Sequence, residues 1–218
     1  MIEAVTQCSH ERGLVMNSED WNQRYDGDEL IWTATPNQFL VSEVEGLQPG
    51  SVLDVACGEG RNAVWLALQG WEATGVDFSS VALEKAAKLA AHNDVAASWI
   101  EADITTWAPV ASSFDLIVLA YVHLPSEARG KLHRTFADGL APGGTLLIIA
   151  HSLENLTSGF GGPPSADVLF SPDDVISDLS GLGLTVEKAE LVTRTVQSDD
   201  GEKHALDTLV RARRPLSL

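Results

Sequence analysis

Residues 52–62 constrain the fold of this chain more than any other segment. The run Val-Leu-Asp-Val has the composition of a buried strand, and Cys-Gly-Glu-Gly then breaks it before a helical pattern begins near Arg61. Gly58 and Gly60 allow the backbone to approach a ligand where a Cβ atom would collide, and the first turn of the helix offers unpaired N–H groups. A strand, a glycine turn and a helix in this order predict a site for a nucleotide-like cofactor.

The acids around the glycine turn distinguish two classes of cofactor. With Ala63 the segment satisfies G-x-G-x-x-A, the pattern of nicotinamide and flavin sites. Asp54 at the tip of the strand and Glu59 between the glycines would repel a pyrophosphate, whereas they would attract the ammonium and sulfonium groups of S-adenosylmethionine. A polar residue that merely ends the strand is the simpler alternative for Asp54. The turn therefore favours S-adenosylmethionine, with a nicotinamide cofactor as the alternative.

Two further acids follow at the ends of predicted strands. Residues 72–76 predict a second strand that delivers Asp77 about 20 positions beyond the glycine turn, where a carboxylate can accept hydrogen bonds from both hydroxyls of a ribose. Residues 99–104 predict a third strand that ends in Ala-Asp-Ile. Asp103 could border the ligand there, or it could serve only as a turn residue or helix cap. Only a parallel sheet collects successive strand tips at one carboxyl edge, so we expect the acids to border one site.

Apolar runs and turn signals predict the rest of the sheet. Residues 114–120 are almost continuously apolar, as in a strand covered on both faces, and residues 121–125 would border both cofactor and substrate. A fifth strand is expected at 145–150, after the helix stop and turn in Leu-Ala-Pro-Gly-Gly. Alternating runs at 184–192 and 205–211 predict a closing hairpin, which nicotinamide-binding sheets usually lack.

Two segments outside the sheet are candidates for covering the site. The stretch 152–170 contains several glycines and prolines, and a loop of that length in a compact domain is usually a lid or a binding loop. A helix start follows at 171–174. Near the N-terminus, Trp21, Tyr25 and Trp32 lie in a polar context and need either a core or a ligand to cover them. An amphipathic helix that packs its aromatic side chains on the sheet is the alternative.

These motifs resemble those of the class I S-adenosylmethionine-dependent methyltransferases, over roughly residues 17–151. The N-terminal aromatic segment is similar to that of small-molecule methyltransferases of the tellurite-resistance and thiopurine groups. The resemblance implies an α/β fold: a doubly wound, Rossmann-like, seven-stranded sheet, mostly parallel with an antiparallel last strand. Residues 1–16 lie outside the resemblance and are expected to form a flexible tail. Residues 17–218 are expected to form a single domain, divided into a cofactor and substrate cap at 17–50 and a core at 51–214.

The resemblance also assigns roles to individual residues. Asp54 would organise the methionine end of the cofactor, Asp77 would bind the ribose, and Asp103 would accept from the adenine amino group. Arg24 could clamp the methionine carboxylate with two parallel hydrogen bonds. The complete set of expected cofactor-binding residues is Trp21, Arg24, Trp32, Asp54, Ala56, Cys57, Gly58, Gly60, Asn62, Asp77, Phe78, Ala102, Asp103, Ile104 and Ala120.

His123 and His151 are the candidate catalytic bases, because both follow predicted strand tips. Sulfonium is a good leaving group, so in-line positioning and exclusion of water can supply most of the rate, and only a protonated acceptor needs a base. Both histidines could instead be structural or only line the site. The expected function is methyl transfer from S-adenosylmethionine to a small molecule, with S-adenosylhomocysteine as product. The alternatives are a nicotinamide-dependent oxidoreductase, a decarboxylase or other user of the same cofactor, and a non-catalytic S-adenosylmethionine-binding sensor.

Composition narrows the partners and the compartment. A net charge of −17 over 218 residues, without a basic stripe, argues against nucleic acid. No apolar run approaches the ~20 residues of a bilayer helix, and no secretory pattern opens the chain. Cys8 and Cys57 have neither metal-binding nor disulfide spacing, which predicts a cytoplasmic protein without a metal. The expected partner is a small, uncharged or cationic methyl acceptor, while the sequence leaves open the acceptor atom, the oligomeric state and the choice of Met1 or Met16 as the start.

Overall fold

The computed structural model of the protein describes residues 18–27, 30–31 and 33–216. The tail expected at 1–16 and the expected cofactor residue Trp32 lie outside these residues. The sheet is built from the strands β1 (Ser51–Val55), β2 (Glu72–Asp77), β3 (Ala97–Glu101), β4 (Phe114–Ala120), β5 (Leu140–His151), β6 (Thr185–Ser198) and β7 (Gly201–Arg213). The helices are α1 (Ser18–Tyr25), α2 (Gln38–Val44), α3 (Arg61–Leu68), α4 (Ser80–His92), α5 (Ser126–Asp138), α6 (Asn155–Ser158) and α7 (Pro172–Leu179), with a short 3-10 turn, η1 (Ala166–Val168).

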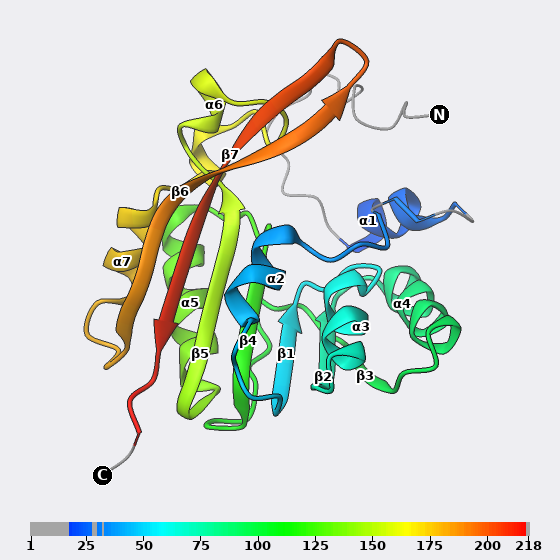
Figure 1. The fold of residues 1–218 in the computed structure, drawn as a ribbon, viewed down its shortest axis with the longest axis vertical. Helices are drawn as coiled ribbons and strands as arrows, with labels where there is room; N and C mark the ends of the chain where they lie inside the picture. The colour runs from blue at the N-terminus through cyan, green and yellow to red at the C-terminus, as the bar shows by residue number, and fades with distance from the viewer. Residues whose placement is uncertain (1–17, 28–29, 32, 217–218) are drawn as a thin grey trace.

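The strand order is β3-β2-β1-β4-β5-β7-β6, and helices cover both faces of the sheet (Figure 1). Strands β1 to β5 run parallel, whereas β7 is inserted between β5 and β6 and pairs antiparallel with both. This arrangement confirms the expected seven-stranded, doubly wound sheet with an antiparallel last strand. The closing hairpin is also confirmed, although both of its strands are longer than the alternating runs that predicted it.

The core lies on both faces of the central strands. Leu53 and Ile117 are fully buried with side chains of α5 and α7, and their neighbours Val52 and Leu116 are fully buried on the other face with side chains of α2 and α3. Because consecutive residues of these strands are buried on opposite faces, the strands are apolar at nearly every position. Helix α7 begins with the predicted cap: the Ser171 and Asp174 side chains and backbones bond to each other reciprocally.

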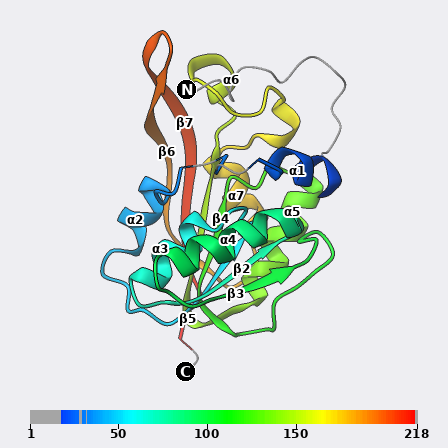
Figure 2. The ribbon, with the colours of Figure 1, turned by 90° about the vertical axis from the view of Figure 1, so that its right-hand side faces the viewer.

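The carboxyl ends of the five parallel strands meet at one edge of the sheet, where α1, α6 and the chain that follows α6 lie (Figure 1, Figure 2). The β6–β7 hairpin extends past the same edge, because β7 leaves β5 at the His151–Asp207 pair while its pairing with β6 continues to Ser198 and Gly201. The stretch 152–170, expected as one long loop, contains α6 and η1. No helix among the described residues is long and apolar enough to cross a membrane.

Candidate cofactor and acceptor site

The glycine turn after β1 is held in the left-handed backbone region at three positions. The φ angles of Ala56, Gly58 and Gly60 are 53°, 52° and 79°. The amide of Cys57 donates to the carbonyl of Val76 over 3.0 Å, which fastens the turn to β2. The turn therefore reverses the chain at the carboxyl edge and points the first turn of α3 back over it, as the sequence predicts.

Gly58 and Gly60 have different roles in this turn. A Cβ atom on Gly58 would lie 3.0 Å from the Tyr25 hydroxyl, so this glycine keeps the space between the turn and α1 open. A Cβ atom on Gly60 would lie 2.7 Å from the Cβ of Ala86 and 2.8 Å from the ring of Trp99. Gly60 is therefore required for packing against α4 and β3, whereas the close approach expected for a ligand concerns Gly58.

Asp54, the last residue but one of β1, is a buried acid with little to compensate its charge. Its Oδ2 accepts a hydrogen bond from the amide of Ala63 at 3.2 Å. The pKa of this carboxyl is raised to about 7, mainly by burial and to a lesser extent by nearby Asp77, while the Ala63 hydrogen bond and the Arg61 guanidinium oppose the shift. A cationic ligand group would supply the missing compensation, so the electrostatics at Asp54 suit an ammonium and disfavour a phosphate.

Asp77, at the end of β2, fixes the glycine turn. Its Oδ2 accepts from the Gly58 amide at 2.8 Å and its Oδ1 from the Ser79 amide at 2.9 Å. Burial raises the pKa of the carboxyl, and these two hydrogen bonds counteract part of the rise. Each carboxylate oxygen has a second lone pair, so Asp77 can accept ribose hydroxyls while it holds the turn.

Asp103 follows β3 at the same edge but is exposed. Its Oδ1 accepts from both the amide and the hydroxyl of Thr105, at 2.8 and 2.7 Å, which is the turn role considered as the alternative. The amide of Ala102 donates to the carbonyl of Asp77 over 2.9 Å and brings the ends of β2 and β3 together. Three acids therefore lie at successive strand ends, with the other expected residues of this edge either buried or half-buried: Phe78, Ala102, Ile104 and Ala120.

Several expected cofactor residues have protein partners. Asn62 is buried, and its Oδ1 accepts from the amide of Asn37 at 3.0 Å, which anchors the start of α2. Cys57 is buried with its sulfur against Gly75, so its backbone is the part that can reach a ligand. Glu59 was expected to add negative charge to the turn, but its carboxylate lies 3.2 Å from the Lys85 ammonium. Glu59 is therefore compensated within the protein, and Asp54 is the acid of this turn that is left to interact with a ligand.

Helix α1 lies over the turn. Tyr25 is buried and stacks on Trp21 with ring centroids 5.6 Å apart, and the Arg24 guanidinium lies 5.1 Å from the Trp21 ring centroid. The hydroxyl of Ser79 donates to the Asn22 side-chain oxygen over 2.6 Å and links α1 to the start of α4. Trp21 and Tyr25 therefore pack on each other, as expected for a packed helix. Tyr25 also lies beside Gly58, so α1 has the expected position next to the cofactor edge.

A second group of side chains lies beyond β4 and β5. The rings of His123 and His151 stack with centroids 5.5 Å apart and an interplanar angle of 14°, and Tyr121 lies 5.0 Å from His151. Tyr121 has a φ of 60°, a strained conformation for a residue other than glycine, and its amide donates to the carbonyl of Ile149 over 2.7 Å. The kink turns the aromatic ring of Tyr121 toward the histidines.

Asp207 of β7 organises this group. The carboxylate is fully buried; its Oδ2 accepts from the Tyr121 hydroxyl at 2.8 Å and from the Arg194 Nε at 3.0 Å, and its Oδ1 lies 3.1 Å from the His151 Nδ1. Burial alone would raise the pKa of Asp207, but His151, Arg194 and Tyr121 together lower it below its usual value. Burial and the neighbouring His151 lower the pKa of His123 to about 4.

Sequence reasoning identified the two histidines and placed Tyr121 within the segment that borders the site, but it did not identify Arg194 or Asp207. One signal was present: Asp207 interrupts the run Ala-Leu-Asp-Thr-Leu-Val, in which a buried acid needs partners. Its partners come from β5, β6 and the residue that follows β4, and no local pattern identifies them.

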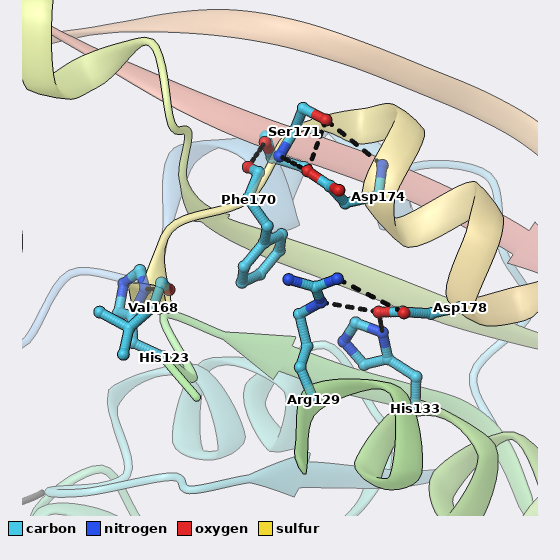
Figure 3. Close-up of polar contacts among 9 residues, drawn as sticks. His123, Arg129, His133, Val168, Phe170, Ser171, Asp174 and Asp178 are labelled. Atoms are coloured by element: carbon cyan, nitrogen blue, oxygen red, sulfur yellow. Dashed lines mark hydrogen bonds and ion pairs between the residues drawn. The ribbon is translucent and has the colours of Figure 1, made fainter. Parts of the chain in front are cut away.

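The chain between α6 and α7 lies against the histidines. The carbonyl of Val168 is 3.2 Å from the Nδ1 of His123 (Figure 3), and a Cβ atom on Gly162 would lie 2.7 Å from the His151 ring. Asn155 fixes the start of this segment, since its side-chain amide donates to the Gly161 carbonyl over 2.7 Å and its oxygen accepts from the Leu206 amide at 2.7 Å. The position agrees with the expected cover over the site.

A buried ion cluster fixes the other end of the cover. Asp178 of α7 accepts from the Arg129 Nε at 2.7 Å and lies 3.0 Å from the His133 Nδ1, both on α5, while the Arg129 guanidinium lies 4.9 Å from the centre of the Phe170 ring (Figure 3). Arg129 and His133 lower the pKa of Asp178, although burial acts in the opposite direction. The cluster joins α5 to α7 and so positions the residues that contact His123. Among the described residues, no group of three or more His, Cys, Asp or Glu side chains could hold a metal ion.

Comparisons with known proteins agree with this geometry. Residues 52–144 match the family described as methyltransferase domain. Rat glycine N-methyltransferase (Rattus norvegicus) is 28% identical over 190 residues, covering 78% of this chain and 64% of the relative, so the chain spans less than two thirds of that relative's length. The chain therefore contains a methyltransferase domain of this family over residues 52–144.

Two solved structures share the fold. The first comes from work on the conversion of a disulfide bond into a thioacetal group during echinomycin biosynthesis, and it has a TM-score of 0.75, 21% identity and coverage of 92% of this chain and 93% of that chain. The second is magnesium protoporphyrin IX methyltransferase from Synechocystis with bound S-adenosylhomocysteine, with a TM-score of 0.63, 18% identity and coverage of 88% and 91%. At these identities the likeness establishes the architecture alone.

Proposed function

We propose that this protein transfers the methyl group of S-adenosylmethionine to a small-molecule acceptor at the carboxyl edge of the sheet. The observation that carries the proposal is the electrostatic state of Asp54: a buried carboxyl at a glycine turn, with a pKa of about 7, next to an edge lined by two more acids. Such a site gains most from a ligand that is cationic at one end and rich in hydrogen-bond donors along the rest.

The described residues fit the parts of S-adenosylmethionine in chain order. Asp54 would face the ammonium group, the second lone pairs of Asp77 would accept the ribose hydroxyls, and Asp103 would accept from the adenine amino group through the oxygen that Thr105 leaves free. Arg24 and Trp21 on α1 remain the proposed contacts of the methionine end. The cofactor supplies an activated methyl group, and the protein supplies alignment and a site from which water is excluded.

A small acceptor is supported by the relatives and by the charge of the chain. Glycine and magnesium protoporphyrin IX, which appear in the names of two related methyltransferases, are both small molecules. A net charge of −17 would repel a nucleic acid. The acceptor would bind beyond β4 and β5, where His123, His151 and Tyr121 converge under the chain that follows α6.

Titration calorimetry tests the cofactor assignment. We expect heat of binding with S-adenosylmethionine and S-adenosylhomocysteine and none with NADH. Binding of NADH without binding of either sulfur compound would favour the oxidoreductase instead. The matched variant is Asp54→Asn, because asparagine retains the shape and an oxygen for the Ala63 amide but removes the charge.

An acceptor screen scored by release of S-adenosylhomocysteine tests the reaction. Panels of small alcohols, phenols, thiols, amines and carboxylic acids are incubated with the cofactor, and the products are analysed by mass. A methylated product supports the proposal. A decarboxylated cofactor would indicate the decarboxylase, and a cofactor that binds but remains unchanged with every panel would indicate a sensor.

A further inference from the structure

The two stacked histidines differ in what lies behind them. The Nδ1 of His123 is 3.2 Å from the Val168 carbonyl, and a carbonyl can only accept, so Nδ1 carries the proton and Nε2 is left as a lone pair. That Nε2 is buried and has no hydrogen-bond partner among the described residues. A buried acceptor without a hydrogen-bond partner costs free energy, so a bound molecule that donates a hydrogen bond to this atom would be stabilised.

His151 is oriented by a carboxylate instead of a carbonyl. Its Nδ1 and the Oδ1 of Asp207 lie 3.1 Å apart, which is an ion-pair distance, and both atoms are buried without a hydrogen-bond partner among the described residues. Asp207 is fully buried and already accepts from Tyr121 and Arg194 through its other oxygen. A lone pair on Nδ1 would face the carboxylate oxygen and be repelled by it, so this contact favours the proton of His151 on Nδ1 and leaves its Nε2 as a second lone pair.

The surroundings decide which histidine can hold a second proton. The charged and titratable groups that face His151 are Asp207 of β7, Arg194 of β6, and Tyr121 and His123 after β4. Asp207 places its carboxylate 3.1 Å from the Nδ1 of His151 and shares it with Arg194, so a negative group lies behind the His151 ring. His123 has only a carbonyl behind it and a neighbouring imidazole in front, so protonation there is disfavoured.

We propose that His151, positioned by Asp207, is the general base of the acceptor site, and that His123 is a hydrogen-bond acceptor that orients the same substrate. The substrate class that follows is an acceptor with a protonated nucleophile: an alcohol, phenol, thiol or amine that carries at least one O–H, S–H or N–H. The inference rests on the function proposed above.

The step balances without any further reactant. The acceptor X–H donates its proton to the Nε2 of His151, and the lone pair of X forms a bond to the methyl carbon. The carbon–sulfur bond breaks, both of its electrons stay on sulfur, and S-adenosylhomocysteine is the neutral-sulfur product. The proton on the imidazolium of His151 then passes to water.

Tautomers measured by long-range proton–nitrogen NMR on histidine-labelled protein test this assignment, with the His123→Ala and His151→Ala variants assigning the signals. We expect both rings in the Nδ1–H form. In Asp207→Asn, the asparagine oxygen must stay toward Arg194, which can only donate, so the amide group faces His151 and forces it into the Nε2–H form. His123 should keep its tautomer in that variant.

Steady-state kinetics provide a second test. They use the acceptor that gives the greatest release of S-adenosylhomocysteine in the screen. His151→Ala and Asp207→Asn should each lower kcat on the order of 10²–10⁴-fold. The acidic limb of the pH–rate profile should disappear in His151→Ala. His123→Ala should raise KM by about 3–10-fold, keep that limb and change kcat little. The control is His92→Ala, an exposed residue at the end of α4, which should behave as wild type.

Three results would overturn the inference: His151 in the Nε2–H form in the wild-type protein, an unchanged tautomer in Asp207→Asn, or loss of the acidic limb in His123→Ala instead of His151→Ala. Calorimetry with S-adenosylhomocysteine is run on the same samples. Failure of the proposed function is then seen as an absence of binding heat, whereas failure of the base assignment is seen in the histidine signals alone.

Discussion

The two halves of the carboxyl edge shift the pKa of a buried acid in opposite directions. On the β1–β3 side, Asp54 is buried with one backbone hydrogen bond, and burial raises its pKa to about 7. On the β4–β7 side, Asp207 is equally buried but has three side-chain partners, and these lower its pKa despite burial. An acid whose charge is left uncompensated is prepared for a cationic ligand, whereas one that is fully compensated orients its neighbours.

Removal of the compensated acid should have the largest effect on stability. Asp207→Ala would leave Arg194 as a partly buried charge without its carboxylate and would free the Tyr121 hydroxyl and the His151 Nδ1. We expect a loss of about 3–5 kcal/mol in the free energy of unfolding, measured by urea denaturation. Asp200→Ala, at the exposed tip of the same hairpin, should change it by less than about 0.5 kcal/mol. A loss below about 1 kcal/mol for Asp207→Ala would show that its network contributes little.

Removal of the uncompensated acid, Asp54, should raise the free energy of unfolding instead of lowering it. Asp54 has a folded-state pKa of about 7 against an ordinary value of 3.8, so its contribution to stability is fully present below the lower value and is lost as pH rises through the higher one. Asp54→Asn should therefore stabilise the ligand-free protein on the order of 2–4 kcal/mol at pH 8 and by almost nothing at pH 4. Denaturation at the two pH values checks this, and a destabilised variant at pH 8 would contradict it.

The same acid should couple cofactor binding to pH. Because an ammonium requires the ionised form of Asp54, binding of S-adenosylmethionine near pH 7 should release about half a proton, and affinity should fall by about tenfold per pH unit well below 7. Calorimetry in two buffers with different ionisation enthalpies measures the release. Asp54→Asn should abolish the proton release and lose roughly 10–100-fold in affinity. Equal proton release in wild type and variant would assign it to another group.

Asp103 should show the smallest effect on the cofactor side. Its carboxylate is exposed and already engaged by Thr105, so a hydrogen bond to the adenine amino group is worth no more than about 1 kcal/mol. Asp103→Asn should weaken binding of S-adenosylhomocysteine by less than about fivefold, in contrast with Asp54→Asn. A loss above about 20-fold would mean that binding buries Asp103.

The placement of the three acids at one edge of the sheet could be predicted from the sequence because each acid follows its own strand. The glycine turn, Asp54, Asp77 and Asp103 each follow their own strand, and a parallel order is enough to bring strand ends together. The partners of those residues could not be predicted. Glu59 is one example: its sequence position predicts a charge that faces the ligand, but Lys85, 26 positions away on α4, pairs with it.

The acceptor side needed the tertiary structure. The sequence determined that His123 and His151 follow strand ends and that a hairpin closes the sheet. It did not determine that β7 enters between β5 and β6, which places Asp207 opposite His151 and within 2.8 Å of a tyrosine hydroxyl 86 positions earlier in the chain. Local patterns specify a strand and its tip through side-chain periodicity, whereas the neighbours of a buried charge depend on which strands pair and in what register, and only the folded sheet sets both.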